Sequence, residues 1–174
     1  MLRLLLLRHA KAAPPNGLDD RERPLTSAGR EASSRLGAYL AREGLVPDLA
    51  LVSPAQRTRE TWTIARRGLR DVPTRGEPRI YEAAPERLLT VVKETDAEVG
   101  TLLMVGHNPG LQELLRLLIP DQERFTHGGL IAQYPPASLA LVTLPAPAWH
   151  DLSLRSGHLE QFVTPKSLGL REGE

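Results

Sequence analysis

Two histidines, two arginines and a glutamate follow short apolar runs of this sequence. They are Arg8, His9, Arg57, His107 and Glu82. Arginine guanidinium groups bind phosphoryl oxygens as bidentate donors, and a neutral imidazole can attack phosphorus. A carboxylic acid can protonate a leaving oxygen. If these side chains meet, the set predicts a phosphoryl-transfer site that needs no metal.

The apolar runs predict the strands that would bring these side chains together. The runs at 2–7, 49–52 and 101–105 are continuous rather than alternating, as in buried parallel strands. Further strands are predicted over 78–81, 138–144 and 159–163. In open α/β sheets, ligands bind at the carboxyl ends of the parallel strands. The five candidate residues are therefore expected at one edge of the sheet.

Helical patterns alternate with these strands. Helices are predicted from Thr26 or Ser27 to about Gly44, from Ser53-Pro54, over 85–95 and from Asn108-Pro109. Residues 10–25 and 120–137 are predicted as loops. The alternation predicts an α/β fold, a three-layer αβα sandwich with a mainly parallel central sheet. Since no linker divides the pattern, residues 1–174 are predicted to form a single domain.

Composition and charge exclude several functional classes. The formal net charge is +1, from 22 Lys and Arg against 21 Asp and Glu, which gives no electrostatic reason to expect nucleic acid or membrane as a partner. The chain has no cysteine, so thiolate catalysis and disulfides are excluded. The apolar run Leu4–Leu7 is too short for a signal peptide or a spanning helix. A cytoplasmic location is predicted.

Three segments resemble the histidine phosphatase superfamily, which also contains the phosphoglycerate mutases. They are Arg-His-Ala at 8–10, Ser-Pro-Ala-Gln-Arg-Thr-Arg-Glu-Thr at 53–61 and Val-Gly-His-Asn-Pro at 105–109. The short length and Arg-Pro-Leu-Thr at 23–26 are most similar to bacterial phosphohistidine phosphatases of the SixA type. The resemblance runs from residue 1 to about 163 and implies a phosphoglycerate mutase-like fold.

The resemblance also implies a role for each candidate residue. His9 would take the phosphoryl group, while Arg8, Arg57 and His107 would line the phosphate pocket. Glu82 lies where many members carry a proton donor. No metal and no cofactor are implied.

Three functions are compatible with these residues. The first is a phosphatase for phosphohistidine in a protein, and the second is a phosphatase for a small phosphorylated metabolite. An open, shallow site favours the protein substrate, whereas a deep one favours the metabolite. The third is a non-catalytic phosphate-binding module, although a binder has no need for His9.

Other polar and aromatic residues are interpreted as structural or exposed. His127, His150 and His158 follow none of the strands that carry the predicted site. Trp62 and Trp149 are interpreted as packing residues.

Overall fold

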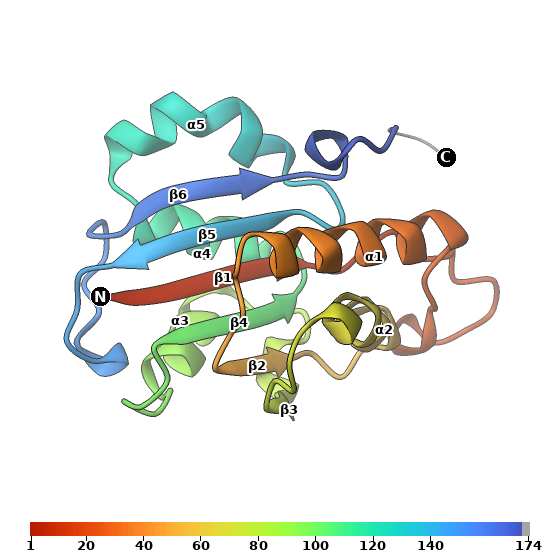
Figure 1. Cartoon of the computed structure of the whole chain (residues 1–174), viewed down its shortest axis with the longest axis horizontal. Helices are drawn as coiled ribbons and strands as arrows, with labels where there is room; N and C mark the ends of the chain where they lie inside the picture. The colour runs from red at the N-terminus through yellow and green to blue at the C-terminus, as the bar shows by residue number, and fades with distance from the viewer. Residues whose placement is uncertain (172–174) are drawn as a thin grey trace.

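A six-stranded mixed sheet forms the centre of the molecule, with strand order β3-β2-β4-β1-β5-β6 (Figure 1). The computed structural model describes residues 1–171, and the side chains of all of these except residues 125 and 130. The strands are β1 (Leu2–Arg8), β2 (Leu49–Val52), β3 (Thr74–Gly76), β4 (Thr101–Gly106), β5 (Leu139–Leu144) and β6 (His158–Val163). Strands β1 to β4 run parallel, whereas β5 is antiparallel to both β1 and β6. The predicted α/β fold is confirmed.

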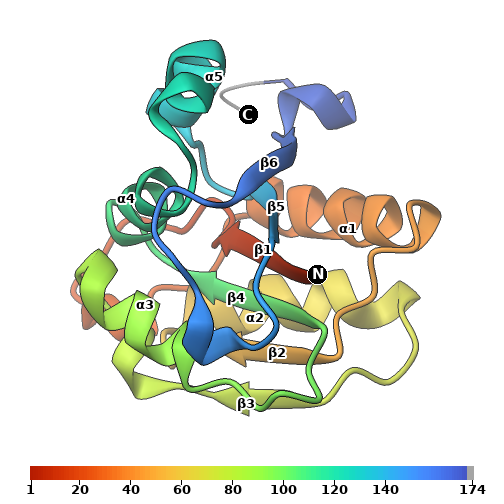
Figure 2. The ribbon, with the colours of Figure 1, turned by 90° about the vertical axis from the view of Figure 1, so that its left-hand side faces the viewer.

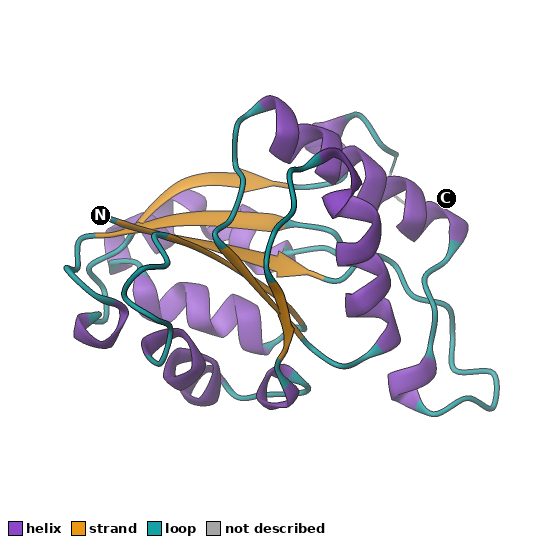
Figure 3. Ribbon diagram, turned by 60° about the horizontal axis from the view of Figure 1, so that its bottom comes forward, coloured by secondary structure: helices purple, strands orange, loops and turns teal. Residues whose placement is uncertain are grey.

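Helices cover both faces of this sheet. They are α1 (Ser27–Arg42), α2 (Gln56–Ala65), α3 (Pro85–Lys93), α4 (Gly110–Leu118) and α5 (Asp121–Gln133). Figure 2 shows α1 and α2 on one face and α3 and α4 on the other, and Figure 3 shows the strands between these layers. Within residues 1–171, no helix combines the length and the apolar composition needed to cross a bilayer.

The leucine-rich strand β1 lies at the centre of two hydrophobic cores. Leu4 and Leu6 point into the core beneath α3 and α4, while Leu5 and Leu7 point into the core beneath α1 and α2. All four side chains are fully buried. Burial of each stabilises the fold by roughly 1.5–3 kcal/mol. The strand that carries Arg8 and leads to His9 is therefore held from both faces.

Two glycines let helices approach the loops that follow the strands. A Cβ atom on Gly29 of α1 would overlap the carbonyl oxygen of Lys11. A Cβ atom on Gly110 of α4 would overlap the carbonyl oxygen of Ala83. Because only glycine permits these contacts, the loops after β1 and before α3 lie directly against the helices.

The prediction of a strand over 78–81 is wrong. Residues Pro78–Ile80 form a 3-10 helix, η3, and the third strand is instead Thr74–Gly76, which pairs with β2. Proline has no N–H to donate to a sheet ladder, whereas it is well suited to the first turn of a helix. Tyr81 and Glu82 therefore follow a helical turn rather than a strand.

Two other predictions also need correction. The segment 120–137, predicted as a loop, contains helix α5. Helix α2 begins at Gln56 rather than at Ser53-Pro54, and its N-cap residue, Ala55, offers no side-chain hydrogen bond. The Ser53 hydroxyl group contacts His107 instead.

Candidate active site

The carboxyl ends of β1, β2 and β4 bring the predicted residues together at one edge of the sheet. The backbone N–H of His9 donates to Gly106 at 3.1 Å, which joins the ends of β1 and β4. The rings of His9 and His107 lie 5.3 Å apart, centroid to centroid. Nη2 of Arg57 lies 3.3 Å from Nδ1 of His107 and 3.6 Å from Oε1 of Glu82. Residues predicted from separate strands and loops thus form one cluster.

His9 presents Nε2 as the atom that can react. Its Nδ1 lies 2.8 Å from the carbonyl oxygen of Ala10. A carbonyl can only accept a hydrogen bond, so we assign the proton to Nδ1. The lone pair is then on Nε2, and the ring is held in a fixed orientation.

The environment of His9 keeps its imidazole neutral. The residue is 9% exposed. Burial lowers the pKa of His9 from 6.5 to about 4, with smaller contributions from the positive charges of Arg57, Arg8 and Arg23. At neutral pH the ring is therefore unprotonated at Nε2, as a nucleophile must be.

The two arginines supply fixed positive charge beside His9. Arg57 is 2% exposed, whereas Arg8 is partly buried and donates from Nη1 to the carbonyl oxygen of Tyr134 at 2.9 Å. Burial lowers the pKa of Arg8 from its ordinary value, but guanidinium groups stay charged in proteins. Among the described residues, the Nε atoms of both arginines are buried without an acceptor. The site therefore holds more donors than the protein's own acceptors satisfy.

His107 is held between a guanidinium and a hydroxyl group. Its Nε2 lies 2.7 Å from Oγ of Ser53, and its Nδ1 faces Arg57. Because Nη2 of Arg57 can only donate, Nδ1 is the acceptor and Nε2 donates to Ser53. Burial, together with His9 and Arg57, lowers the pKa of His107 from 6.5 to about 3, so this ring is also neutral.

Glu82 is the most exposed of the predicted site residues. Its side chain is 59% exposed, and its backbone has a φ of 49°. Non-glycine residues rarely adopt this left-handed conformation, which often marks functional positions. In this conformation Oε1 of Glu82 lies 3.6 Å from Nη2 of Arg57.

Comparison with known proteins identifies the family. The model of the histidine phosphatase superfamily (branch 1) matches residues 4–98, which is more than half of the 174 residues. The chain belongs to this superfamily. An uncharacterized protein of Mycobacterium tuberculosis is 31% identical over 162 residues, covering 92% of this chain and 100% of the relative. A chloroplastic, uncharacterized protein of Arabidopsis thaliana is 28% identical over 180 residues, covering 95% and 78%.

Solved structures of the superfamily share the whole architecture. A protein of Agrobacterium tumefaciens, assigned as a phosphohistidine phosphatase SixA, superposes with a TM-score of 0.81 at 29% identity, covering 94% of this chain and 98% of that one. A protein of Nakamurella multipartitia, also assigned as SixA, superposes with a TM-score of 0.82 at 25% identity, covering 94% of this chain and 96% of that one. A SixA structure complexed with tungstate has the same fold, with a TM-score of 0.79 at 21% identity, covering 96% and 99%.

Sequence patterns alone did not predict several residues that contact the site. Asp20 and Tyr81 contact the Arg57 region, Ser53 contacts His107, and the carbonyl of Tyr134 accepts from Arg8. Ser53 was noted only as a helix cap, and Tyr81 only as a strand end. Asp20 lies within the polar loop that follows β1, eleven residues after His9 and not directly after a strand, so no local pattern distinguishes it from Asp19 beside it.

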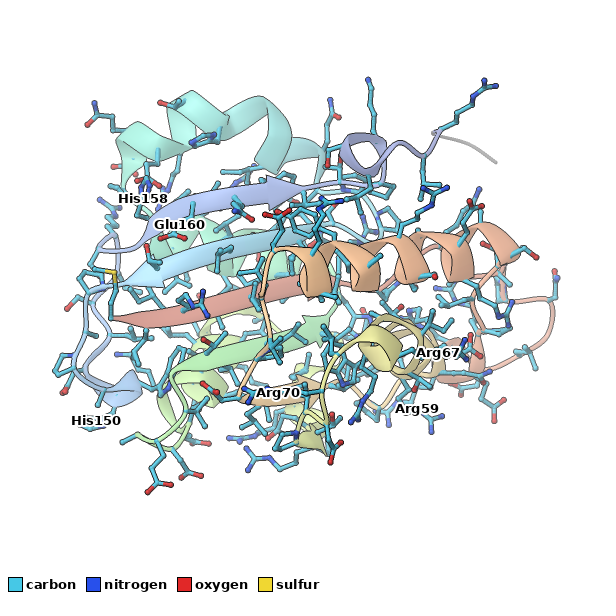
Figure 4. The ribbon with its side chains drawn as sticks, in the orientation of Figure 1. Arg59, Arg67, Arg70, His150, His158 and Glu160 are labelled. Atoms are coloured by element: carbon cyan, nitrogen blue, oxygen red, sulfur yellow. The ribbon has the colours of Figure 1, made fainter. Side chains whose placement is uncertain are left out.

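The remaining histidines and tryptophans agree with the structural interpretation. His150 and His158 are exposed and lie at the end of the sheet opposite the His9 edge (Figure 4). His127 lies in α5. Trp62 and Trp149 are buried in the two cores. Among residues 1–171 there is no group of three or more His, Asp or Glu side chains placed to hold a metal ion.

Proposed function

We propose that this chain is a phosphatase that removes the phosphoryl group from phosphohistidine in a protein, through a covalent phosphohistidine at His9. The observation that carries the proposal is the 2.8 Å contact between Nδ1 of His9 and the Ala10 carbonyl. This contact leaves Nε2 unprotonated beside two guanidinium groups. A phosphate-binding module would need the arginines but not a nucleophile prepared in this way.

The proposed reaction has two steps. In the first, Nε2 of His9 attacks phosphorus, the P–N bond of the substrate breaks, and the leaving imidazole takes a proton from water. In the second, water attacks phosphorus and the bond from phosphorus to Nε2 of His9 breaks. The hydroxide left by the first step takes the proton of the attacking water, inorganic phosphate leaves, and His9 returns to its neutral form with its proton on Nδ1. Little covalent chemistry is required of the protein, so catalysis depends on positioning and on stabilisation of the phosphoryl oxygens.

Arg8, Arg57 and His107 would stabilise these oxygens. In the free protein Nδ1 of His107 accepts from Arg57. To donate to a phosphoryl oxygen, Nδ1 must carry the proton, and Nε2 must then accept. The Ser53 hydroxyl group, 2.7 Å from Nε2, can donate as well as accept. Ser53 therefore allows His107 to change tautomer as the substrate binds.

Two observations support a protein substrate. The chain is similar to structures assigned as SixA phosphohistidine phosphatases, and a pocket lies beside the site. A pocket of about 250 Å³ is lined by three cationic residues and one acidic residue, together with prolines, alanines and Leu170. The cationic residues are Lys11, Lys166 and Arg171, and the acidic residue is Glu31. Lys11 follows His9 by two residues, and Pro135 in this pocket follows Tyr134, which binds Arg8. Acidic residues that flank the phosphohistidine of a substrate protein would contact these cations.

A small phosphorylated metabolite is the second candidate, and Glu82 favours it. An ester leaves as a poor alkoxide that needs a proton, whereas a phosphoramidate leaves readily as imidazole. Glu82, whose Oε1 lies 3.6 Å from Nη2 of Arg57, would supply that proton from its carboxylic acid form.

The two candidates differ in their response to Glu82→Gln. We expect a histidine-phosphorylated peptide to be hydrolysed by the variant within about threefold of the wild-type rate. Hydrolysis of a phosphate ester should fall by a factor of roughly 10²–10⁴, as for loss of general acid catalysis. Efficient ester turnover with no turnover of phosphohistidine would contradict the proposed substrate. Failure to turn over either substrate would favour the phosphate-binding module.

The proposal also includes the domain organisation and the location predicted from the sequence. We infer that residues 1–174 act as one histidine phosphatase domain, and that it works in the cytoplasm. The lack of cysteine supports this location, and the charge balance gives no reason to propose a nucleic-acid or membrane partner.

A further inference from the structure

Asp20 links the loop after β1 to the buried arginine of α2. It is the first residue of a 3-10 helix, η1 (Asp20–Glu22). Nη1 of Arg57 donates to the backbone carbonyl of Asp20 at 2.7 Å, and Nη2 donates to its Oδ2 at 3.0 Å. Asp20, 37 positions away along the chain, thus accepts hydrogen bonds from both terminal nitrogens of the Arg57 guanidinium.

Asp20 is itself held in place from two sides. Its Oδ2 accepts a hydrogen bond from the Tyr81 hydroxyl group at 2.5 Å, and its Oδ1 accepts from Nε of Arg23 at 3.0 Å. The guanidinium of Arg21, next along η1, lies 4.3 Å above the Tyr81 ring. The loop after β1 and the turn before α3 therefore fix the carboxylate jointly.

Few other groups orient Arg57. Its Nε has no acceptor among the described residues, and the Glu82 carboxylate is farther away than Asp20, at 3.6 Å. Apart from Asp20, the nearest acceptor is Nδ1 of His107, at 3.3 Å. An arginine side chain carries about 2 kcal/mol of rotamer entropy, so a guanidinium with few partners is poorly fixed.

We propose that Asp20 is a positioning residue, which orients the Arg57 guanidinium toward the phosphoryl group bound at His9. The proposal rests on the function proposed for Arg57. Asp20 acts through Arg57, not as a proton donor. The Tyr81 hydroxyl group, followed by Arg57, lowers the pKa of Asp20 to about 2, so the carboxylate is ionised at neutral pH.

A double-mutant cycle with Arg57→Ala tests this role. The measured quantity is the single-turnover rate of phosphoenzyme formation with a small phosphoryl donor. We expect Asp20→Ala to lower this rate about tenfold or more, since small misplacements of catalytic groups are costly. Asp20→Asn, which retains an acceptor for Arg57, should lose less. In the Arg57→Ala background, Asp20→Ala should cost less than about twofold, because interacting residues are not additive.

Asp19→Ala is the matched control. Asp19 caps the same 3-10 helix by accepting from the backbone N–H of Arg21 at 3.0 Å. The substitution removes one charge from the same loop without touching Arg57, so its rate should stay within about twofold of wild type. Thermal melting of each variant shows whether the fold is retained.

Three outcomes would overturn the inference. Equal losses in Asp19→Ala and Asp20→Ala would indicate a general effect on the loop. Additive losses in the cycle would show that Asp20 does not act through Arg57. A faster rate in Asp20→Ala would show that the carboxylate competes with phosphate for Arg57. By contrast, an unchanged rate in Arg57→Ala alone would contradict the function proposed for the site. This result differs from the three outcomes that contradict only the role of Asp20.

Discussion

Nη2 of Arg57 lies 3.3 Å from Nδ1 of His107, and this contact determines which nitrogen of the imidazole carries the proton. A guanidinium only donates, so Nδ1 accepts and Nε2 donates to Ser53. Arg57 lies in the first turn of α2, whereas His107 follows the end of β4, and both residues are buried. This pairing couples the charge of Arg57 to the tautomer of His107.

Loss of Arg57 is expected to lower the rate of phosphoryl transfer by a factor of about 10²–10³, as for removal of a single charge-stabilising donor. Arg57→Ala and Arg59→Ala should be compared by kcat and KM on the same phosphoryl donor. Arg59 lies on the same helix, but its side chain is exposed at the surface of the molecule (Figure 4). Its substitution should change the rate less than twofold. Equal losses in both variants would contradict a specific role for Arg57.

Loss of the Ser53 hydroxyl group is expected to impair His107. Ser53→Ala leaves Nε2 of His107 buried without a partner, which costs about 1–3 kcal/mol. Activity should fall about tenfold or more if His107 must change tautomer during binding. Ser33→Ala is the control, because Ser33 is also buried and donates from Oγ to the carbonyl of Gly29, away from the site. A variant that is destabilised but fully active would exclude the tautomer change.

The stability of the protein is expected to fall between pH 7 and pH 5. The pKa values of His9 and His107 are about 4 and about 3 in the folded chain, against 6.5 ordinarily. In this window the unfolded chain binds protons that the folded chain excludes, so acidification favours unfolding. Each histidine contributes a loss of about 2 kcal/mol by this linkage.

Urea unfolding at pH 7 and pH 5 checks this linkage. The His9→Gln variant should lose less stability on acidification than the wild type, by about one histidine's contribution. Substitution of exposed His150 is the matched control for the removal of one histidine. Parallel pH dependence in the wild type and His9→Gln would contradict a neutral, buried His9.

Much of the architecture could be predicted from the sequence, because burial leaves a strong pattern. The run 4–7 is apolar at successive positions because neighbouring side chains, such as Leu4 and Leu5, point into different cores. The end of this run therefore predicts Arg8 and His9 as site residues. The end of the apolar run 101–105 predicts His107 in the same way. The prediction was weaker where a segment lacked such a pattern: α5 contains Gly128 and Gly129, which are unfavourable in a helix.

Other features depend on contacts between distant segments. Ser53-Pro54 has the local pattern of a helix start, but the hydroxyl group of Ser53 contacts His107, 54 residues away. The bond from Arg57 to Asp20 likewise joins α2 to a loop with no periodic signal. Sequence patterns report local structure and burial, whereas these contacts arise only once the fold is complete.

The central claim is that Nε2 of His9 carries the phosphoryl group during turnover. Intact-mass spectrometry after brief reaction with a small phosphoryl donor and an acid-free quench tests this claim directly, with wild type beside His9→Ala. We predict a transient adduct of one phosphate on the wild type and none on His9→Ala, whose fold should be retained. Turnover by His9→Ala at near wild-type rate, or turnover by the wild type with an adduct that does not require His9, would contradict the account.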